Sequence, residues 1–423
     1  MKIAMTSYSG YGAWFLRRLV REKHDVTYFN TSTDEAIRKV CKGLVPKPKL
    51  EKYPDYAGFD LSIFDLTGKP RAADASAEVC PTIGDGSLNC KLEDDRTFGI
   101  QVMEQAGITV PPYESFANTQ DAIKFARKSG KRYVFKPAGG QDQDADVTYV
   151  SHDTPDLIGF LEKLDPKVAV VPCILQEFVK GTEVSVEGWF DGSEFWLLNS
   201  TLEDKKFMND NKGPNTGCAG NLVLLIKSTD KIYREGLEKV KDILRQLGYI
   251  GMIDLNTIVT EDKAYGLEWT PRAGYDASAT LQRMYAGDYG EMLASVASGV
   301  QPDALWGAEY GVSVRLSIPP YPTEVKGKHK SEVICSGLNP ERDYLYDAML
   351  DGTASSLDPG IKTVGTTGLV AAPIIVGNDV QRIWDEVYNL ADNKIKIPNV
   401  QYRTDCGKSS MKKLATLKTQ GWL

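Results

Sequence analysis

Short apolar runs alternate with amphipathic stretches over the first ninety residues. Residues 2–5, 25–29 and 61–65 are apolar runs of strand length, and residues 12–21 carry apolar positions at helical spacing. This alternation predicts a parallel sheet covered by helices. The turn at residues 7–12 contains two glycines and opens the first helix, so its N–H groups are suited to an anion. A plain tight turn explains the same residues equally well.

The rest of the chain mixes helices with longer strands. The predicted helices are residues 92–105, 118–129, 230–247 and 379–391; the predicted strands are residues 168–178 and 182–190, with two more flanking a polar loop between 133 and 150. From about residue 309 the chain becomes β-rich, and it closes with a basic segment at 408–418. We therefore expect boundaries near residues 90, 190 and 305.

Composition narrows the class of protein. The 423 residues are 42% apolar and 25% charged, which predicts a globular chain of two to four lobes. The net charge of -7 disfavours a general nucleic-acid surface, and no apolar run approaches the ~20 residues of a membrane span. Seven scattered cysteines without a Cys-x-x-Cys pair predict reduced thiols in a cytoplasm. The three histidines are far apart in the sequence, which disfavours a histidine-based metal site.

Two adjacent apolar segments carry the most informative polar residues. Residues 251–256 and 266–272 predict a hairpin, with a polar turn at 259–263. Asp254 lies in the first strand and Glu268 and Arg272 at the end of the second. Two carboxylates beside a guanidinium suit a magnesium-bound nucleotide, if the strand register brings them together. Taken alone, the pattern is also typical of a solvated surface hairpin.

Lys136 ends an apolar strand and is followed by a glycine-containing turn with Gly139 and Gly140. A strand-end lysine beside loop amides is a suitable phosphate ligand, although such lysines are often solvated. Residues 176–183 (Gln-Glu-Phe-Val-Lys-Gly-Thr-Glu) are suited to the adenine edge and ribose of a nucleotide. On periodicity alone they predict two strands joined at Gly181.

Three segments, in order, resemble motifs of phosphoribosylamine–glycine ligase, a family of the ATP-grasp superfamily. They are residues 92–96, which resemble Leu-Glu-Gly-Ser-Lys; residues 204–206 with 213–217, which resemble Asp-x-Lys-Arg and Gly-Pro-Asn-Thr-Gly-Gly-Met-Gly; and residues 401–407, which resemble Tyr-Arg-x-Asp-Ile-Gly. Lys136, the 176–183 segment and the hairpin also follow the order of the superfamily, and the similarity covers nearly the whole chain.

The resemblance implies a fold and an activity. The fold is α/β: an ATP-grasp fold with an N-terminal parallel-sheet α/β domain (1–90), a two-lobed ATP-binding core (91–305, with 91–130 and 190–305 as the larger lobe and 131–189 as the small lobe) and a small C-terminal α+β domain (306–423). The activity is ligation of a carboxylate to an amine through an acyl phosphate, with ATP and Mg²⁺ and with Mn²⁺ as a substitute.

Site residues follow from the resemblance position by position. It implies Arg272, Lys205 and Asn215 as catalytic residues; Arg96, Lys136, Gly139, Gly140, Glu177, Phe178, Val179 and Glu183 as nucleotide-binding residues; Thr216, Gly217, Gly10 and Gly12 as substrate-binding residues; and Asp254, Glu268 and Thr270 as metal ligands. It also implies small-molecule partners, an amino acid such as glycine and an amine. A membrane is not expected, nor is nucleic acid favoured, and the chain is expected to be a monomer or homodimer in the cytoplasm.

Several departures from the family concern the amine. Residues 8–14 lack the arginine and histidine of Gly-Gly-Arg-Glu-His, the family's Gly-Pro-Glu has no counterpart near residues 65–68, and residues 346–349 and 367–370 lack a further histidine and arginine. Since charge-assisted phosphate contacts are strong, these losses predict weaker binding of phosphoribosylamine and an altered amine substrate. The direct alternative is an authentic phosphoribosylamine–glycine ligase of purine biosynthesis.

Other departures concern the nucleotide. Arg96 replaces a lysine, the loop at 141–146 contains three aspartates, and Thr270 stands where the family has a metal-binding Asn, for which Asp254 is expected to compensate. The altered loop and Thr270 motivate a further alternative, a degenerate protein that only binds nucleotide. The basic segment at 408–418 motivates another, a ligase acting on a nucleic-acid-linked amine, although a solvated helix explains that segment better. Glu203 and Asp210 are expected to be solvated.

Overall fold

A computed structural model of the chain describes residues 1–52, 54–65, 68, 70–138, 148–164, 166–323, 332–351 and 360–423. The N-terminal segment forms a parallel sheet of order β2-β1-β3-β4, which confirms the predicted α/β pattern. Its elements are β1 (Lys2–Ser7), α1 (Ala13–Arg21), β2 (Asp25–Asn30), the short helix η1 (Ile37–Lys39), β3 (Leu61–Phe64), α2 (Pro70–Ala77) and β4 (Thr82–Ile83).

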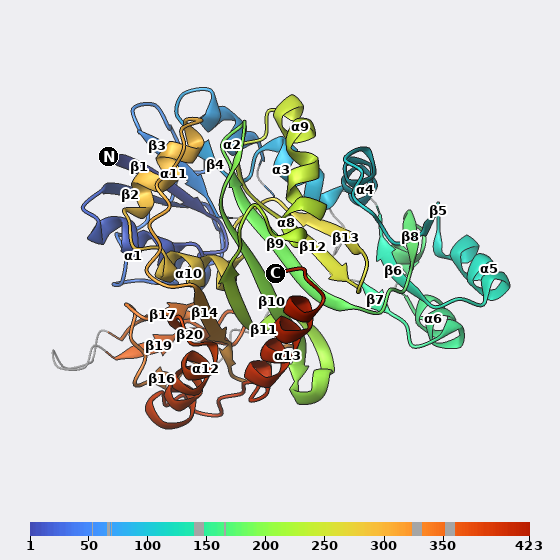
Figure 1. Ribbon diagram of the computed structural model, residues 1–423. Coiled ribbons are helices and arrows are strands. Elements are labelled where there is room, and N and C mark those ends of the chain that lie inside the picture. Colours follow the sequence, from blue (N-terminus) through green and yellow to red (C-terminus); the bar gives the residue numbers. More distant parts are fainter. Residues whose placement is uncertain are drawn as a thin grey trace.

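A nine-stranded sheet forms the centre of the molecule, with the order β13-β12-β9-β10-β11-β14-β20-β15 and β17 paired to β20 (Figure 1). Its strands are β9 (Thr182–Phe190), β10 (Phe195–Met208), β11 (Lys212–Leu225), β12 (Gly251–Val259), β13 (Ala264–Thr270), β14 (Tyr310–Val314), β15 (Leu316–Ser317), β17 (Asp343–Leu345) and β20 (Leu369–Gly377). The short helix η2 (Asn209–Asn211) joins β10 to β11.

Side chains that alternate along β9 enter different environments on the two faces of this sheet. Val184 and Val186 join an apolar core with α8 (Lys231–Glu235) and α9 (Leu237–Leu247). Trp189 belongs to the core that contains α10 (Tyr275–Met284) and α11 (Tyr289–Ala297). Because strand residues alternate between faces, Ser185 and Glu187 share the Trp189 face, which is therefore partly polar.

A smaller sheet, β5-β8-β6-β7, lies on the far side of the large sheet from the N-terminal sheet (Figure 1). Its elements are β5 (Tyr113–Phe116), α5 (Thr119–Ser129), β6 (Tyr133–Pro137), β7 (Tyr149–Val150), α6 (Thr154–Leu161), α7 (Pro166–Ala169) and β8 (Cys173–Glu177). The Asn118 side chain accepts a hydrogen bond from the Asp121 N–H and so begins α5, as expected for a cap. Apolar side chains of α5 and α6 pack on this sheet.

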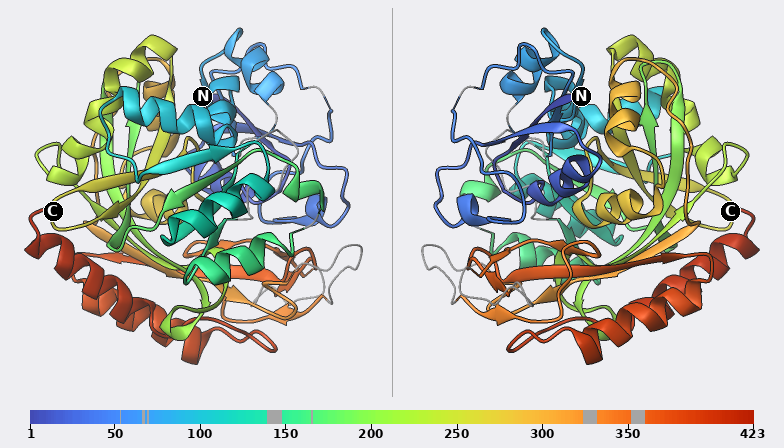
Figure 2. Two further views of the ribbon diagram at one scale, coloured as in Figure 1. Left: turned by 90° about the vertical axis from the view of Figure 1, so that its right-hand side faces the viewer. Right: turned by 90° about the vertical axis from the view of Figure 1, so that its left-hand side faces the viewer.

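The C-terminal part adds a three-stranded sheet, β16-β19-β18, and two helices. Their bounds are β16 (Ile334–Cys335), β18 (Ala348–Leu350), β19 (Ile361–Thr363), α12 (Val380–Asn389), continued by the π-helical turn η3 (Leu390–Lys394), and α13 (Cys406–Thr419). Helix α13 runs along the lower edge of the molecule in Figure 2 and contacts β10 and β11. Lys413 in this basic helix donates to the Glu203 carbonyl oxygen at 2.6 Å.

Three predicted elements differ from the structure. The predicted helix 92–105 is two helices, α3 (Ser87–Asp94) and α4 (Arg96–Gln105), because Asp95 leaves the helical conformation and caps α4 through the Phe98 N–H. The predicted helix 230–247 breaks at Gly236, which packs so closely on β9 that an added Cβ would lie 2.9 Å from Val186. The predicted strand 168–178 begins only at Cys173.

In the described part of the chain, no helix combines the length and apolar character that crossing a membrane requires.

Candidate active site

The register of the β12–β13 hairpin places four polar side chains in two cross-strand pairs. Asp254 lies opposite Thr270, and Asn256 lies opposite Glu268. The Asn256 amide donates to Asp254 Oδ2 at 3.3 Å and to Thr270 Oγ1 at 3.5 Å. The structure therefore brings Asp254, Glu268 and Thr270 together, as the sequence analysis required. Asn256 was missed, although it follows Asp254 by two residues and so shares its face.

Two cationic side chains from outside the large sheet lie near Glu268. Arg96 begins α4 because of the break at Asp95, and its guanidinium lies 3.1 Å from Glu268 Oε2. Lys136 ends β6 of the small sheet, is 5% exposed, and donates to the Leu267 carbonyl oxygen at 3.2 Å. The Arg96 and Lys136 side chains thus reach the same end of β13 from separate elements.

These charges shift the pKa of each partner. Burial alone would raise the pKa of Glu268, but Lys136, Arg96 and Lys205 outweigh burial and lower it to about 2. Burial lowers the pKa of the Lys136 ammonium to about 8, although Glu268 opposes the shift. The lysine is therefore a cation at neutral pH that loses its charge under mildly alkaline conditions.

Lys205 contacts polar side chains of β9, β10 and β12. Its ammonium lies 2.7 Å from Glu183 Oε1, 4.0 Å from Glu203 Oε2 and 3.4 Å from Asn256 Oδ1. Burial by itself would lower the pKa of Lys205, but Glu183 and Glu203 raise it above its usual range. The predicted ribose ligand Glu183 and the predicted catalytic Lys205 are therefore ion-paired to each other.

The predicted adenine segment lies at the edge of the small sheet. Glu177 forms an ion pair with Lys131, and the Phe178 ring lies 3.4 Å from the Arg132 guanidinium carbon. The Phe178 N–H donates to the Arg132 carbonyl oxygen, so this amide is already occupied. Val179 is half-buried. The roles of these residues stay predictions, while Gly139, Gly140 and the loop at 141–146 lie outside the described residues.

Residues 213–217 form part of β11, and their side chains lie in different environments. Thr216 donates to the Lys205 carbonyl oxygen at 2.8 Å and so supports the lysine backbone. Asn215 lies exposed opposite Lys206, and the structure does not bring it to the charged cluster. A Cβ added at Gly217 would lie 3.5 Å from the Arg315 guanidinium, which places that glycine beside a second cation.

The N-terminal glycine turn contacts a carboxylate of its own chain. Asp65 Oδ2 accepts from the Gly12 N–H at 2.9 Å and from the Ser7 hydroxyl at 2.6 Å, and the Gly10 N–H donates to Ser7 Oγ at 2.9 Å. Burial raises the pKa of Asp65 to about 6. The turn therefore does not present its Gly10 and Gly12 amides to an external anion, contrary to the anion-binding alternative. Their place in a substrate pocket stays a prediction.

Glu203 corrects one expectation. It was expected to be solvated, but its side chain is only 26% exposed, and burial raises its pKa to about 7. Asp210 is exposed, as expected, and lies 3.5 Å from Lys212. Sequence alone gave no signal for Glu203 beyond its position two residues before Lys205.

Replacing Glu203 by Gln is expected to stabilise the protein in a pH-dependent way. The folded-state pKa is higher than the ordinary value, so folding favours the protonated acid, and wild-type stability falls as pH rises from about 4.5 to about 7. Relative to wild type, the free energy of unfolding of the variant should rise by about 3 kcal/mol between pH 4 and pH 8. Urea unfolding at both pH values measures this difference. If the variant and wild type differ in unfolding free energy by the same amount at pH 4 and pH 8, Glu203 does not have a raised pKa in the folded protein.

Arg272, predicted to be catalytic, is paired with Glu93. Its guanidinium donates to both carboxylate oxygens, with the shortest distance 2.8 Å, and the two side chains are 24% and 22% exposed. Replacing Arg272 by Met is expected to cost about 1–3 kcal/mol of unfolding free energy, because a half-buried carboxylate loses its cation. A double-mutant cycle with Glu93→Gln separates this pair from other effects. If the unfolding free energy of the Arg272→Met variant equals that of wild type, the pair with Glu93 does not stabilise the fold.

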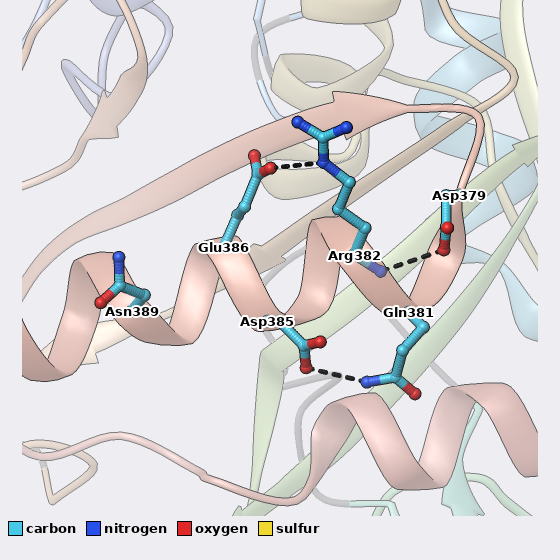
Figure 3. Close-up of a pocket in the computed structure, with 6 residues that line it drawn as sticks. All are labelled: Asp379, Gln381, Arg382, Asp385, Glu386 and Asn389. Atoms are coloured by element: carbon cyan, nitrogen blue, oxygen red, sulfur yellow. Dashed lines mark hydrogen bonds and ion pairs between the residues drawn. The ribbon is translucent and has the colours of Figure 1, made fainter.

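Two other polar groups are explained by local structure. A surface hollow along α12 is lined by Arg382–Glu386 and Gln381–Asp385 pairs of one exposed helix face (Figure 3). His24 lies 2.9 Å from Asp288, which also caps α11. Neither group contains a predicted site residue.

Comparison with known proteins shows where the similarity lies. Residues 94–280 match the family described as phosphoribosylglycinamide synthetase, ATP-grasp (A) domain. A phosphoribosylamine–glycine ligase of Streptococcus pneumoniae is 21% identical over 341 residues, covering 76% of this chain and 77% of that protein.

Solved structures show the same fold. The phosphoribosylamine–glycine ligase of Thermotoga maritima superimposes with a TM-score of 0.74 at 17% identity, covering 96% of this chain and all of that one. The biotin carboxylase domain of 2-oxoglutarate carboxylase from Hydrogenobacter thermophilus, solved with MgADP and bicarbonate, gives a TM-score of 0.65 at 12% identity, covering 99% and 98%. Residues 94–280 therefore match an ATP-grasp domain family, and the chain as a whole resembles phosphoribosylamine–glycine ligases in sequence and fold.

Proposed function

We propose that this protein is an ATP-dependent, ADP-forming ligase that joins a carboxylate to an amine. The observation that carries the proposal is the convergence of Arg96 and Lys136 on Glu268, at the end of the hairpin that also carries Asp254. Two cations are suited to nucleotide phosphates and two carboxylates to a metal ion. The similarity to phosphoribosylamine–glycine ligases supports the same reaction class.

The proposed reaction has two steps. An oxygen of the substrate carboxylate attacks the γ-phosphorus of ATP, the bond to the β-phosphate oxygen breaks, and ADP leaves. The amine then attacks the acyl carbon, a C–N bond forms, the C–O bond to phosphate breaks with its electron pair, and the nitrogen gives up a proton to the departing phosphate. Lys136 and Arg96 would stabilise charge on the transferred group, and Lys205 would orient the substrate.

The donor set fits a magnesium ion. Glu268 stays ionised at neutral pH, and Asp254 Oδ1 is a buried oxygen without a hydrogen-bond partner. Such oxygens suit Mg²⁺, and Mn²⁺ accepts the same ligands. We propose that Glu268 and Asp254 bind the ion, with Thr270 and Asn256 at its border; the ion would supply charge neutralisation at the phosphates.

The amine is proposed to differ from phosphoribosylamine. Asp65 occupies the amide of Gly12 in the N-terminal turn and adds negative charge where a sugar phosphate would need donors. An authentic purine-pathway enzyme remains the direct alternative, with a rebuilt phosphate site. The proposed division at residues 90 and 305, the nucleotide contacts of Glu177 and Val179, and cytoplasmic localisation stay predictions.

Trapping the acyl phosphate tests the proposal. The protein is incubated with Mg-ATP, one amino acid at a time, and hydroxylamine, which is a neutral nucleophile at pH 8. A ligase of this type should release ADP and form the matching amino acid hydroxamate in equal amounts. ADP release without hydroxamate for any acid, or no release at all, would contradict the proposal and support a protein that only binds nucleotide.

A further inference from the structure

Glu203 lies on the same face of the large sheet as the candidate site. Thr201 in β10 is directly opposite Ser185 in β9, and Ser185 is directly opposite Asn256 in β12. Because strand residues alternate between faces, Glu203 shares the face of these residues. Its Oε2 lies 4.0 Å from the Lys205 ammonium, which also lies 3.4 Å from Asn256 Oδ1 at the border of the proposed magnesium site. Glu203 is therefore close to the place where the acyl phosphate would form.

Glu203 differs from its acidic neighbours in its hydrogen bonds. Within the part of the chain that the structure describes, no N–H or O–H group donates to its carboxylate, and its side chain is 26% exposed. By contrast, Glu183 Oε1 pairs with Lys205 at 2.7 Å, and Asp276 accepts from the Nε and Nη2 atoms of Arg315. A cation thus compensates the charge of each of these two neighbours.

Other carboxylates on this face are also committed. Glu187 is 2% exposed, and both of its oxygens accept hydrogen bonds from neighbouring side chains. Glu268 has a pKa of about 2, and together with Asp254 it is assigned to the magnesium ion. A carboxylate that is so acidic, or that binds a metal ion, is a poor acceptor for the proton of an amine.

The basic side chains near the site cannot accept a proton at neutral pH. Neighbouring carboxylates raise the pKa of Lys205 above its usual range, and Lys136, with a pKa of about 8, is a cation at pH 7. The histidines that the structure describes lie elsewhere: His24 contacts the residue that caps α11, and His152 is exposed before α6. The open acceptor at this site is therefore a carboxylate of β10.

The surroundings of Glu203 make it moderately basic. Burial raises its pKa to about 7, although Lys205 opposes the shift. A base whose pKa is near the working pH is ionised in a large share of molecules and still holds a proton well. The charged and titratable groups that interact with Glu203 are Lys205 of β10, Glu183 and Glu187 of β9, Asp276 of α10, Asp254 of β12 and Cys218 of β11.

We propose that Glu203 is the general base of the ligase and that the amine substrate arrives as an alkylammonium ion. An ammonium N–H donates to the Glu203 carboxylate, the proton moves to the carboxylate, and the freed electron pair of the nitrogen attacks the acyl carbon. A second proton passes from the nitrogen to the departing phosphate, and Glu203 returns its proton to solvent through its exposed part. This inference rests on the proposed function, since it assigns a base and an amine class to the same reaction.

The amine class follows from the need for a base. An alkylamine has a pKa of about 10.4, as in lysine, so at pH 7 it must lose a proton before its nitrogen can attack. An amine on a carbon that also bears an oxygen, as in phosphoribosylamine, is less basic because the oxygen withdraws electron density. An alkylammonium substrate also agrees with the absence of the family's arginine and histidine from residues 8–14.

Two nucleophiles of similar size test the base. At pH 7 hydroxylamine is mostly neutral, whereas methylamine is almost entirely methylammonium. With Mg-ATP and an amino acid that supports hydroxamate formation, wild-type protein should also form the N-methylamide from methylamine, as measured by mass spectrometry. In Glu203→Gln, the ratio of the N-methylamide rate to the hydroxamate rate should fall at least about a hundredfold.

The pH dependence of this ratio is a readout that a purely structural role would not change. With a pKa of about 7, the ionised fraction of Glu203 rises about twofold between pH 7 and pH 8, and the wild-type ratio should rise equally. Glu203→Gln depends on free methylamine, whose concentration rises about tenfold over the same range, so its ratio should rise about tenfold.

Two further variants complete the experiment. Glu203→Asp keeps a carboxylate that is one methylene shorter, so its ratio should lie between those of wild type and Glu203→Gln. It also provides the test if the glutamine variant does not fold, which urea unfolding checks. Glu261→Gln, in the exposed turn of the β12–β13 hairpin, is the matched control and should have the wild-type ratio.

The remaining outcomes overturn the base or the ligase separately. Equal ratios in wild type and Glu203→Gln, a tenfold rise with pH in both, or a wild-type protein that forms hydroxamate but no N-methylamide would each remove Glu203 as the base and leave the ligase function intact. Absence of hydroxamate in wild type with every amino acid would overturn the ligase function, and the base with it.

Discussion

Replacing Glu268 by Gln should reduce Mg-ATP-dependent hydroxamate formation by at least about a hundredfold, since a metal ligand and a phosphate-site counter-charge are lost together. Glutamine keeps the size of the side chain but not its charge. Arg96 and Lys136 then face no carboxylate at the end of β13, and the charge of the proposed magnesium site falls by one unit. The rate at saturating ATP, measured over a range of Mg²⁺ concentrations, reports both effects.

Glu261→Gln is the matched control for this variant. Glu261 is exposed in the turn of the same hairpin, so the control removes one carboxylate from the hairpin without touching the cluster. It should retain the wild-type rate and the wild-type magnesium dependence. A Glu268→Gln protein that folds and keeps more than about a tenth of the wild-type rate would remove Glu268 from the proposed metal site.

Lys136→Met is expected to weaken ATP binding by about a hundredfold, because the lysine is delivered to the site by a strand and its charge is only slightly screened by solvent. Methionine keeps the length of the side chain and suits the buried position. Equilibrium titration with ATP at pH 7 measures the loss. Lys128→Met, at an exposed position of the neighbouring helix, provides the control and should bind ATP as wild type does.

The same lysine makes ATP binding depend on pH. With a pKa of about 8, its ammonium is charged at pH 7 and mostly neutral at pH 9 in the free protein. ATP binding must then take up a proton, so wild-type affinity should fall about tenfold between these pH values. Lys136→Met should show no such fall. An equal pH dependence in both proteins would assign the titration to another group.

Much of the fold follows from local patterns. The structure contains the strands predicted near Lys2 and Asp25, strand 182–190, and the helix that Asn118 caps. The breaks at Asp95 and Gly236 were missed for a physical reason. A helical pattern continues through both positions, but Asp95 leaves it to cap the Phe98 N–H, and close packing on β9 makes the backbone leave it at Gly236.

The sequence predicted which residues belong to the candidate site better than it predicted which residues they contact. Glu268, Lys136 and Arg96 carry motif positions, and the structure brings them together. The pairing of Arg272 with Glu93 depends on a contact between residues 179 positions apart, which no local pattern records. No local pattern singles out Glu187 within strand 182–190, because its environment depends on β10 and β12, which flank β9 in the sheet.

The cations of the candidate site are already engaged before any ligand arrives. Lys136 is held by the Leu267 carbonyl oxygen and Arg96 by Glu268, so ATP binding is an exchange of partners. A metal ion that binds Glu268 would replace the ion pair with Arg96, and Arg96 could then bind phosphate. A phosphate that binds Lys136 would replace its hydrogen bond to the Leu267 carbonyl oxygen. Each ligand thereby prepares the site of the other, and thermodynamic reciprocity requires that Mg²⁺ and ATP raise each other's affinity by the same factor. After the transfer, the internal partners compete with ADP for the same cations, which favours release of product.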